Sequence, residues 1–78
     1  MKSDIIAKIE EEHLIDYMDV VNMTERDKEI ANIFISEHPT YRELGERYGI
    51  SHERIRQIII KFARKAHHYY YVEHKDKI

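Results

Sequence analysis

Apolar residues recur along the chain at the three- and four-residue spacing that is typical of α-helices. The clearest run follows Ser51, where the apolar positions fall at i, i+3, i+4, i+7, i+8 and i+11: Ile55, Ile58, Ile59, Phe62, Ala63 and Ala66. Only two glycines and one proline occur in 78 residues, which leaves little material for the turns of β-hairpins. The pattern therefore predicts an all-α fold, a small helical bundle of about four helices.

Residues with capping side chains divide this pattern into segments. Short polar side chains that can accept a hydrogen bond from the first turn of a helix stand at Ser3, Thr24, Thr40 and Ser51. Thr40 and Glu43 have the spacing of a capping box, and His38 ends the second segment because it precedes Pro39. We expect helices over residues 3–21, 24–38, 40–48 and 51–68.

The first segment is apolar over a wider arc than a helix with one buried face needs. At 100° per residue its apolar side chains cover roughly 220°, whereas contact with a single core needs a stripe of about 100°. Either this helix is clamped between other helices, or part of the arc contacts another protein chain. For the second case we name six apolar residues as a protein interface: Ile5, Ile9, Tyr17, Ile33, Phe34 and Ile59.

The join between the third and fourth segments has the residues of a helix-turn-helix. Gly45 supplies a small residue where the second helix crosses the first closely, and Gly49 stands at the turn four residues later. Apolar residues that lock the two helices together fall at Leu44, Tyr48, Ile50, Ile55 and Ile58. We therefore expect a helix-turn-helix at the C-terminal end of the bundle. Such motifs present their second helix to the major groove of DNA, although some serve only protein contacts.

The side of the fourth segment opposite its apolar stripe carries groups that suit DNA. Arg56 and Gln57 match the paired hydrogen-bonding groups of guanine and adenine, and Glu53 can accept from cytosine. Basic side chains near them suit phosphates, which position a helix without specifying sequence. We expect contacts with the DNA backbone from Thr40, Arg42, Ser51, Arg54, Lys61, Arg64 and Lys65. The alternative is that these are ordinary solvated charges on a surface helix.

Three stretches resemble region 4 of bacterial sigma-70 family factors: TERD at 24–27, YRELGERYGIS at 41–51 and HERIRQI at 52–58. The resemblance covers roughly residues 23–68 and is most specific over 53–58. It implies that Glu53, Arg56 and Gln57 read the bases of the −35 promoter element. It also implies that Arg54, Lys61 and Arg64 contact the DNA backbone or neighbouring activators. By the same resemblance, apolar residues of the second to fourth segments would dock on the flap of the RNA polymerase β subunit.

The chain departs from the region 4 pattern at three neighbouring positions. His52 stands where the family usually has an arginine that recognises guanine; a neutral histidine offers one donor, so we expect an altered or weaker promoter preference. Ile59 replaces a common glutamate and widens the apolar stripe. Ile60 lies on the expected DNA face, where it either contacts a thymine methyl or belongs to a protein interface. We count His52 and Ile60 among the base-contacting residues.

The net charge of −2 argues against nucleic-acid binding until it is divided along the chain. Residues 1–37 carry four basic and ten acidic side chains, a net of −6, whereas residues 38–78 carry nine and five, a net of +4. The helix-turn-helix is therefore basic, and an acidic half is easier to explain if it faces away from DNA, towards a protein. We expect a weak DNA reader that needs a partner.

Other kinds of chemistry find little support in the sequence. Cysteine is absent and the six histidines lack a spaced carboxylate pattern, so we expect no metal, no cofactor and no catalytic residues. The longest apolar run, residues 69–72, is far shorter than the ~20 residues of a membrane span. We expect this run to pack on the first segment rather than to stack on bases, and Glu10-Glu11-Glu12 to form a solvated face.

These observations predict one domain over residues 1–78, with an N-terminal amphipathic helix (1–22), a helix-turn-helix core (23–68) and a C-terminal tail (69–78). The sequence shows no counterpart of sigma regions 2 and 3, so we do not expect a complete sigma factor. We expect a cytoplasmic, nucleoid-associated transcription factor that reads a −35-like element in double-stranded DNA. It would join RNA polymerase or another sigma subunit, as part of a split sigma factor or as a co-activator. The alternative is a β-flap binder or homodimer that inhibits or redirects transcription with little sequence-specific DNA binding.

Overall fold

The computed structural model describes residues 4–74, and its regular secondary structure is helical. Its elements are α1 (Asp4–Glu11), a 3₁₀ turn η1 (Leu14–Tyr17), α2 (Glu25–Glu37), α3 (Tyr41–Tyr48) and α4 (His52–His74). The described part of the chain contains no strand, which confirms the all-α prediction of four helices. None of these helices is both long enough and apolar enough to cross a membrane.

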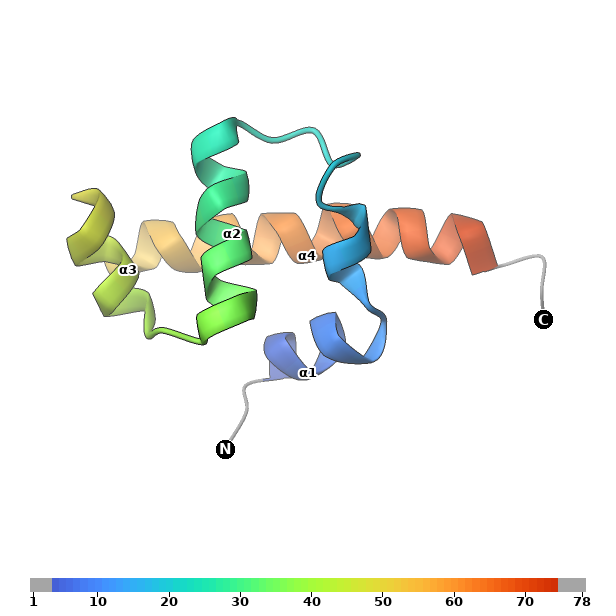
Figure 1. Cartoon of the computed structure of the whole chain (residues 1–78), viewed down its shortest axis with the longest axis horizontal. Coiled ribbons are helices and arrows are strands. Elements are labelled where there is room, and N and C mark those ends of the chain that lie inside the picture. Colours follow the sequence, from blue (N-terminus) through green and yellow to red (C-terminus); the bar gives the residue numbers. More distant parts are fainter. Residues whose placement is uncertain (1–3, 75–78) are drawn as a thin grey trace.

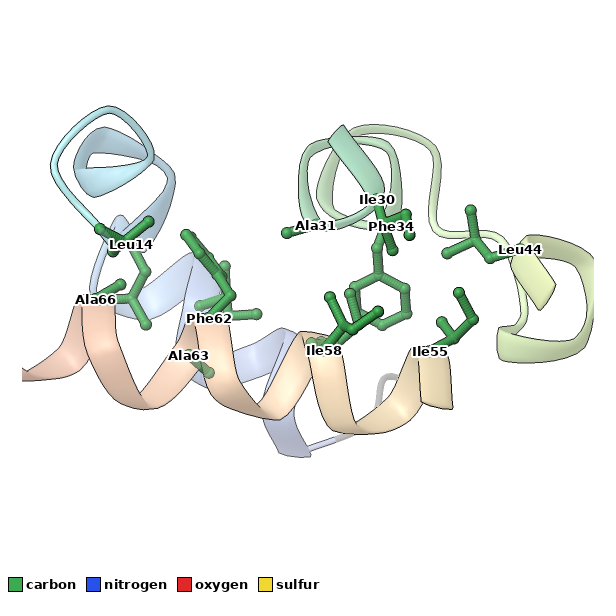
Figure 2. Close-up of a cluster of buried hydrophobic side chains, with 13 residues drawn as sticks. Leu14, Ile30, Ala31, Phe34, Leu44, Ile55, Ile58, Phe62, Ala63 and Ala66 are labelled. Atoms are coloured by element: carbon green, nitrogen blue, oxygen red, sulfur yellow. The ribbon is translucent and has the colours of Figure 1, made fainter. Parts of the chain in front are cut away.

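The other four elements all pack against helix α4. Figure 1 shows α4 along the long axis of the molecule, with α2 and η1 crossing it on one side and α3 at its N-terminal end. The predicted apolar stripe of α4 forms the floor of the core, in which Ile55, Ile59, Phe62 and Ala66 are completely buried. Side chains from the other elements close over this stripe (Figure 2), among them Leu14, Ile30, Phe34 and Leu44.

The capping residues place the helix boundaries as the sequence predicts. Thr24 Oγ1 accepts a hydrogen bond from the Asp27 N–H at 3.1 Å, and Ser51 Oγ accepts from the Arg54 N–H at 3.1 Å. Both bonds of the Thr40–Glu43 capping box are present. These local bonds satisfy amide groups that otherwise lack partners in the first turn of a helix.

The prediction of one helix over residues 3–21 is wrong. α1 ends at Glu11, and His13 adopts the left-handed conformation (φ 53°, ψ 43°) before η1 begins. In a continuous helix Ile9 and Leu14 would lie about 140° apart, at 100° per residue. The break turns the chain so that both side chains are buried in the same core, at 2% and 0% exposure. The wide apolar arc therefore belongs to two short elements that approach α4 from different directions; Ser3 lies outside the described residues.

Helix α4 continues past its predicted end at His68, so the segment assigned to the tail is helical as far as residue 74. Residues 75–78 lie outside the described part. Tyr69 stacks on Tyr17, with ring centroids 6.3 Å apart, and Tyr70 packs on the core, as predicted for this run. Tyr69 is nevertheless exposed, and so are Tyr71 and Val72. The Tyr17 hydroxyl donates a 2.7 Å hydrogen bond to Glu73, which ties the last turns of α4 to η1.

The acidic run Glu10-Glu11-Glu12 is only partly the solvated face that the sequence predicts. Glu12 Oε1 lies 2.8 Å from His67 Nδ1 of α4, and Glu10 Oε1 lies 3.4 Å from His38 Nε2 at the end of α2. Consecutive helical residues point in different directions, as expected. Two of those directions, however, lead to histidines on neighbouring elements, so the run helps to dock α1.

Candidate nucleic-acid interface

The turn between α3 and α4 brings the two helices into very close contact. Gly49 ends α3 in the left-handed conformation (φ 69°, ψ 31°), and its N–H donates to the carbonyl oxygen of Gly45. A Cβ atom on Gly45 would lie 2.6 Å from the carbonyl oxygen of Ile50, closer than real Cβ contacts come. Leu44 and Ile55, both fully buried, lock the crossing from the core side. The two glycines thus have the structural roles that the sequence assigns to them.

The base-reading residues that the sequence predicts lie on the side of α4 away from the core. His52, Glu53, Arg56 and Gln57 are exposed, whereas Ile60 is half-buried. A groove of about 500 Å³ runs along this side, lined by Arg56, Gln57, Ile60, Lys61, Arg64 and Lys65. Its two rows of side chains follow the i, i+4 spacing of the helix. The fold therefore brings three of the five predicted base contacts and three of the seven predicted phosphate contacts into one channel, while His52 and Glu53 lie outside its lining.

Charge along this side of α4 is almost entirely positive. Between Arg54 and Val72 the sequence contains no aspartate or glutamate and five lysines or arginines. Glu53 precedes this stretch and accepts a 2.8 Å hydrogen bond from the Arg56 guanidinium. Both side chains are about half exposed, and pairs of this kind contribute only about 0.3–0.5 kcal/mol. Arg56 can therefore exchange its carboxylate partner for a base at little cost.

The remaining predicted backbone contacts lie at or near the starts of α3 and α4. Thr40, Arg42, Ser51 and Arg54 are all exposed. The Thr40 and Ser51 hydroxyls accept the capping bonds, and each hydroxyl keeps its own hydrogen as a donor. The Thr40 N–H also donates to Glu43, and this bond holds the pKa of the Glu43 carboxyl below its ordinary value. A negative charge therefore stands beside Thr40, which weakens the case for a phosphate there.

Comparison with known protein families gives one match. The sequence model of the family described as Sigma-70, region 4 matches residues 21–65, which is 45 of the 78 residues. The chain belongs to the sigma-70 region 4 family. No characterised protein and no solved structure matches it. This match confirms the resemblance seen in the sequence. Region 4 domains act in transcription by binding DNA and RNA polymerase, and they are regulatory modules rather than enzymes.

The protein interface predicted for this region 4 domain needs correction. Ile9, Phe34 and Ile59 are buried in the core, so their side chains are not available to another chain. Ile5, Tyr17 and Ile33 are only partly buried. Ile59 widens the apolar stripe of α4, as the sequence indicates, because α1 packs beside this helix and adds Ile9 to the same core. The wider apolar stripe of α4 is therefore part of the core of this chain.

The surface pockets along α4 continue past Lys65, the last of the predicted phosphate contacts. Asn22, His68 and Tyr69 line a second pocket together with Arg64 and Lys65. His68 and Tyr69 follow Arg64 and Lys65 at i+4, a spacing that signals a shared helix face. Asn22 gives no such signal, because it reaches the pocket only through the path of the chain after η1. Within residues 4–74 no group of three or more metal-ligating side chains comes together.

Proposed function

We propose that this region 4 domain reads a −35-like promoter element with α4 and associates with RNA polymerase in the cytoplasm, on the nucleoid. The observation that carries the proposal is the channel along α4. Arg56 and Gln57 lie in it beside a row of lysine and arginine side chains, and the close turn at Gly45 presents the helix. Base-reading groups flanked by phosphate-binding groups are the arrangement of a DNA recognition helix.

Each residue of the channel has a role that follows from its hydrogen-bonding groups. Arg56 offers paired donors to guanine, and Gln57 offers a donor and an acceptor to adenine. His52 and Glu53, in the first turn of α4, reach the bases next to these. Ile60 is half-buried, so only part of its side chain is left to contact a thymine methyl. Lys61, Arg64 and Lys65 bind the phosphates on either side.

The opposed charges of the two halves favour a polymerase-associated role, as part of a split sigma factor or as a co-activator. The acidic residues lie mainly in α1, η1 and α2, which pack on the core side of α4, while the basic residues line its other side. A duplex held by α4 leaves the acidic elements facing outwards, towards a protein. The burial of Ile9 and Ile59 removes two of the residues through which a homodimer of this chain would form.

One binding experiment tests both halves of the proposal. Fluorescence anisotropy would measure the affinity for a −35-like duplex and for an unrelated duplex, over a salt series, with and without RNA polymerase core enzyme. We expect affinity to fall with salt at a log–log slope of about −0.9 per phosphate contact, and to rise when polymerase is present. Arg56→Ala and Gln57→Ala should each cost about 1–3 kcal/mol on the preferred site and reduce discrimination between the duplexes.

Asn32→Ala is the matched control, because Asn32 is an exposed polar residue of α2 and lies outside the channel. It should bind both duplexes as the unaltered chain does. If Arg56→Ala and Gln57→Ala behave like this control, α4 does not read bases. If polymerase leaves the affinity unchanged, the association with polymerase is wrong.

A further inference from the structure

A pocket along α4 extends past the end of the region 4 match. Arg64, Lys65, His68 and Tyr69 of α4 and Asn22 of the segment after η1 line a pocket of about 300 Å³. His68 and Tyr69 lie past residue 65, where the family match ends. The pocket shares Arg64 and Lys65 with the base-reading channel, so the two form one continuous path along the helix.

Most of the surface of this pocket is apolar, but four of its five side chains end in groups that can bind a phosphate. Arg64 and Lys65 carry positive charge, the Asn22 amide offers two donors, and the His68 imidazole offers at least one. None of the five residues that line the pocket is acidic. The volume is about ten times that of a water molecule in the liquid, enough for a phosphate group with its sugar.

The wall of the pocket is braced by contacts from a separate element. Tyr69 stacks on Tyr17 of η1 at an interplanar angle of 14°, and the His68 ring meets the Tyr69 ring edge-on with centroids 6.0 Å apart. The Tyr17 hydroxyl donates to Glu73, and this bond raises the pKa of Tyr17 to about 12, so the hydroxyl stays protonated near neutral pH. Tyr69 and the His68 ring beside it are therefore arranged before any ligand arrives, which lowers the entropic cost of binding.

The position of the pocket along α4 determines which part of a duplex it meets. From Gln57 to His68 the helix rises roughly 17 Å, at about 1.5 Å per residue. The major groove of B-DNA is about 12 Å wide. For α4 lying across the groove with Gln57 against the bases, His68 has therefore passed the groove edge, where the phosphate backbone runs.

We propose that this pocket binds a backbone phosphate of the promoter duplex beside the base-reading segment, so that α4 holds DNA at two places. Arg64 and Lys65 supply the charge, Asn22 and His68 supply directed hydrogen bonds, and Tyr69 fixes the orientation of His68. The inference rests on the proposed DNA-reading function of α4 and extends its footprint beyond the part of the chain that the family covers.

The test combines variants of the pocket with duplexes of different length. Asn22→Ala and His68→Ala remove exposed side chains, so the fold should persist, and circular dichroism would check it. Each should weaken binding to a long duplex five- to tenfold at 0.1 M salt, equally for −35-like and unrelated sequences, and leave the salt slope nearly unchanged, because the neutralising charge stays on Arg64 and Lys65. When the duplex is shortened at the end towards which the C-terminus of α4 points, each variant should bind it with the same affinity as the unaltered chain.

Tyr71→Ala is the matched control, because Tyr71 is an exposed aromatic residue of the same turns and does not line the pocket. It should bind both long and short duplexes as the unaltered chain does. If Asn22→Ala and His68→Ala bind the long duplex as this control does, the inference is wrong. The DNA-reading function would still stand if Arg56→Ala loses discrimination between the −35-like and unrelated duplexes. Failure of the unaltered chain to bind any duplex would refute the proposed function itself.

A free phosphate compound is the other source of the same chemistry. Titration with ATP, followed through the Asn22 side-chain amide resonances by NMR, separates the two sources. We expect ATP to bind only weakly, in the millimolar range, and to be displaced by duplex. Micromolar binding of ATP that persists when duplex is added would assign the pocket to a free nucleotide and overturn the inference.

Discussion

Gly45 determines how closely α3 and α4 can cross, and with it the direction in which α4 projects. The atom nearest to a Cβ built there is the carbonyl oxygen of Ile50, a backbone atom. Ile50 cannot move away freely, because its own N–H donates a 3.0 Å hydrogen bond to the Gly45 carbonyl oxygen. A side chain at position 45 must therefore change the turn itself.

Gly45→Ala should destabilise the protein by about 1–3 kcal/mol, the range found when a tightly packed site is overfilled. It should also weaken duplex binding, since the start of α4 is displaced. Chemical denaturation measures the first effect and anisotropy the second. Glu46→Ala changes the exposed neighbouring residue and should stay within about 0.5 kcal/mol of the unaltered chain. Equal stability of the two variants would show that the crossing is looser than described.

Residue roles that depend on local spacing could be predicted from the sequence. The turn glycines, the capping residues and the exposure of Arg56 and Gln57 all follow from positions a few residues apart. The partners of Glu10 and Glu12 could not be predicted, because His38 and His67 approach them only after α1 has docked. The same holds for Asn22, whose place beside His68 depends on the path between η1 and α2.

At the scale of elements, the break at His13 lets the N-terminal segment bury residues from two sides of a helical wheel. No glycine or proline marks this break, and histidine is not the usual residue for a left-handed position. Periodicity alone therefore predicts a continuous helix there. The prediction for α4 was better because its apolar spacing persists over a dozen residues, although the contacts of Tyr70 and Glu73 that extend it are not local.

His13→Gly should stabilise the protein by about 0.5–1 kcal/mol. A residue with a side chain costs roughly 1–2 kcal/mol in the left-handed conformation, and glycine removes this cost. Glycine also makes the unfolded chain more flexible, which takes back about 0.4–1 kcal/mol of the stabilisation. Thermal and urea unfolding measure the change. Ala7→Gly places glycine inside α1 at an exposed position and should instead destabilise by about 1 kcal/mol. If residues 3–21 formed one continuous helix, both glycine variants would destabilise the protein equally. The sign of the His13→Gly effect therefore decides between a continuous helix and a helix that is broken at His13.

At the scale of the whole molecule, the core does not coincide with the family match. Ile9 and Leu14 precede the match and Ala66 follows it, yet all three belong to one buried cluster. The N-terminal elements therefore complete the region 4 fold in this chain and support the part of α4 that carries the second pocket. The residues that precede the match also add six of the fifteen acidic side chains of the sequence, so part of the acidic surface is supplied by the segment that closes the core.

A fragment of residues 21–78, which keeps the whole family match, should therefore lose cooperative folding. Removing the buried side chains of Ile9 and Leu14 costs about 2–5 kcal/mol each, whereas a chain of this length is stable by only about 4–12 kcal/mol in total. Circular dichroism during thermal unfolding would show reduced helix content and a broad transition. A fragment of residues 4–78 keeps every residue that the structure describes and should unfold as the whole chain does. If residues 21–78 unfold at the same temperature as that reference, the region 4 core is self-sufficient, and α1 and η1 must be retained for their acidic outer surface.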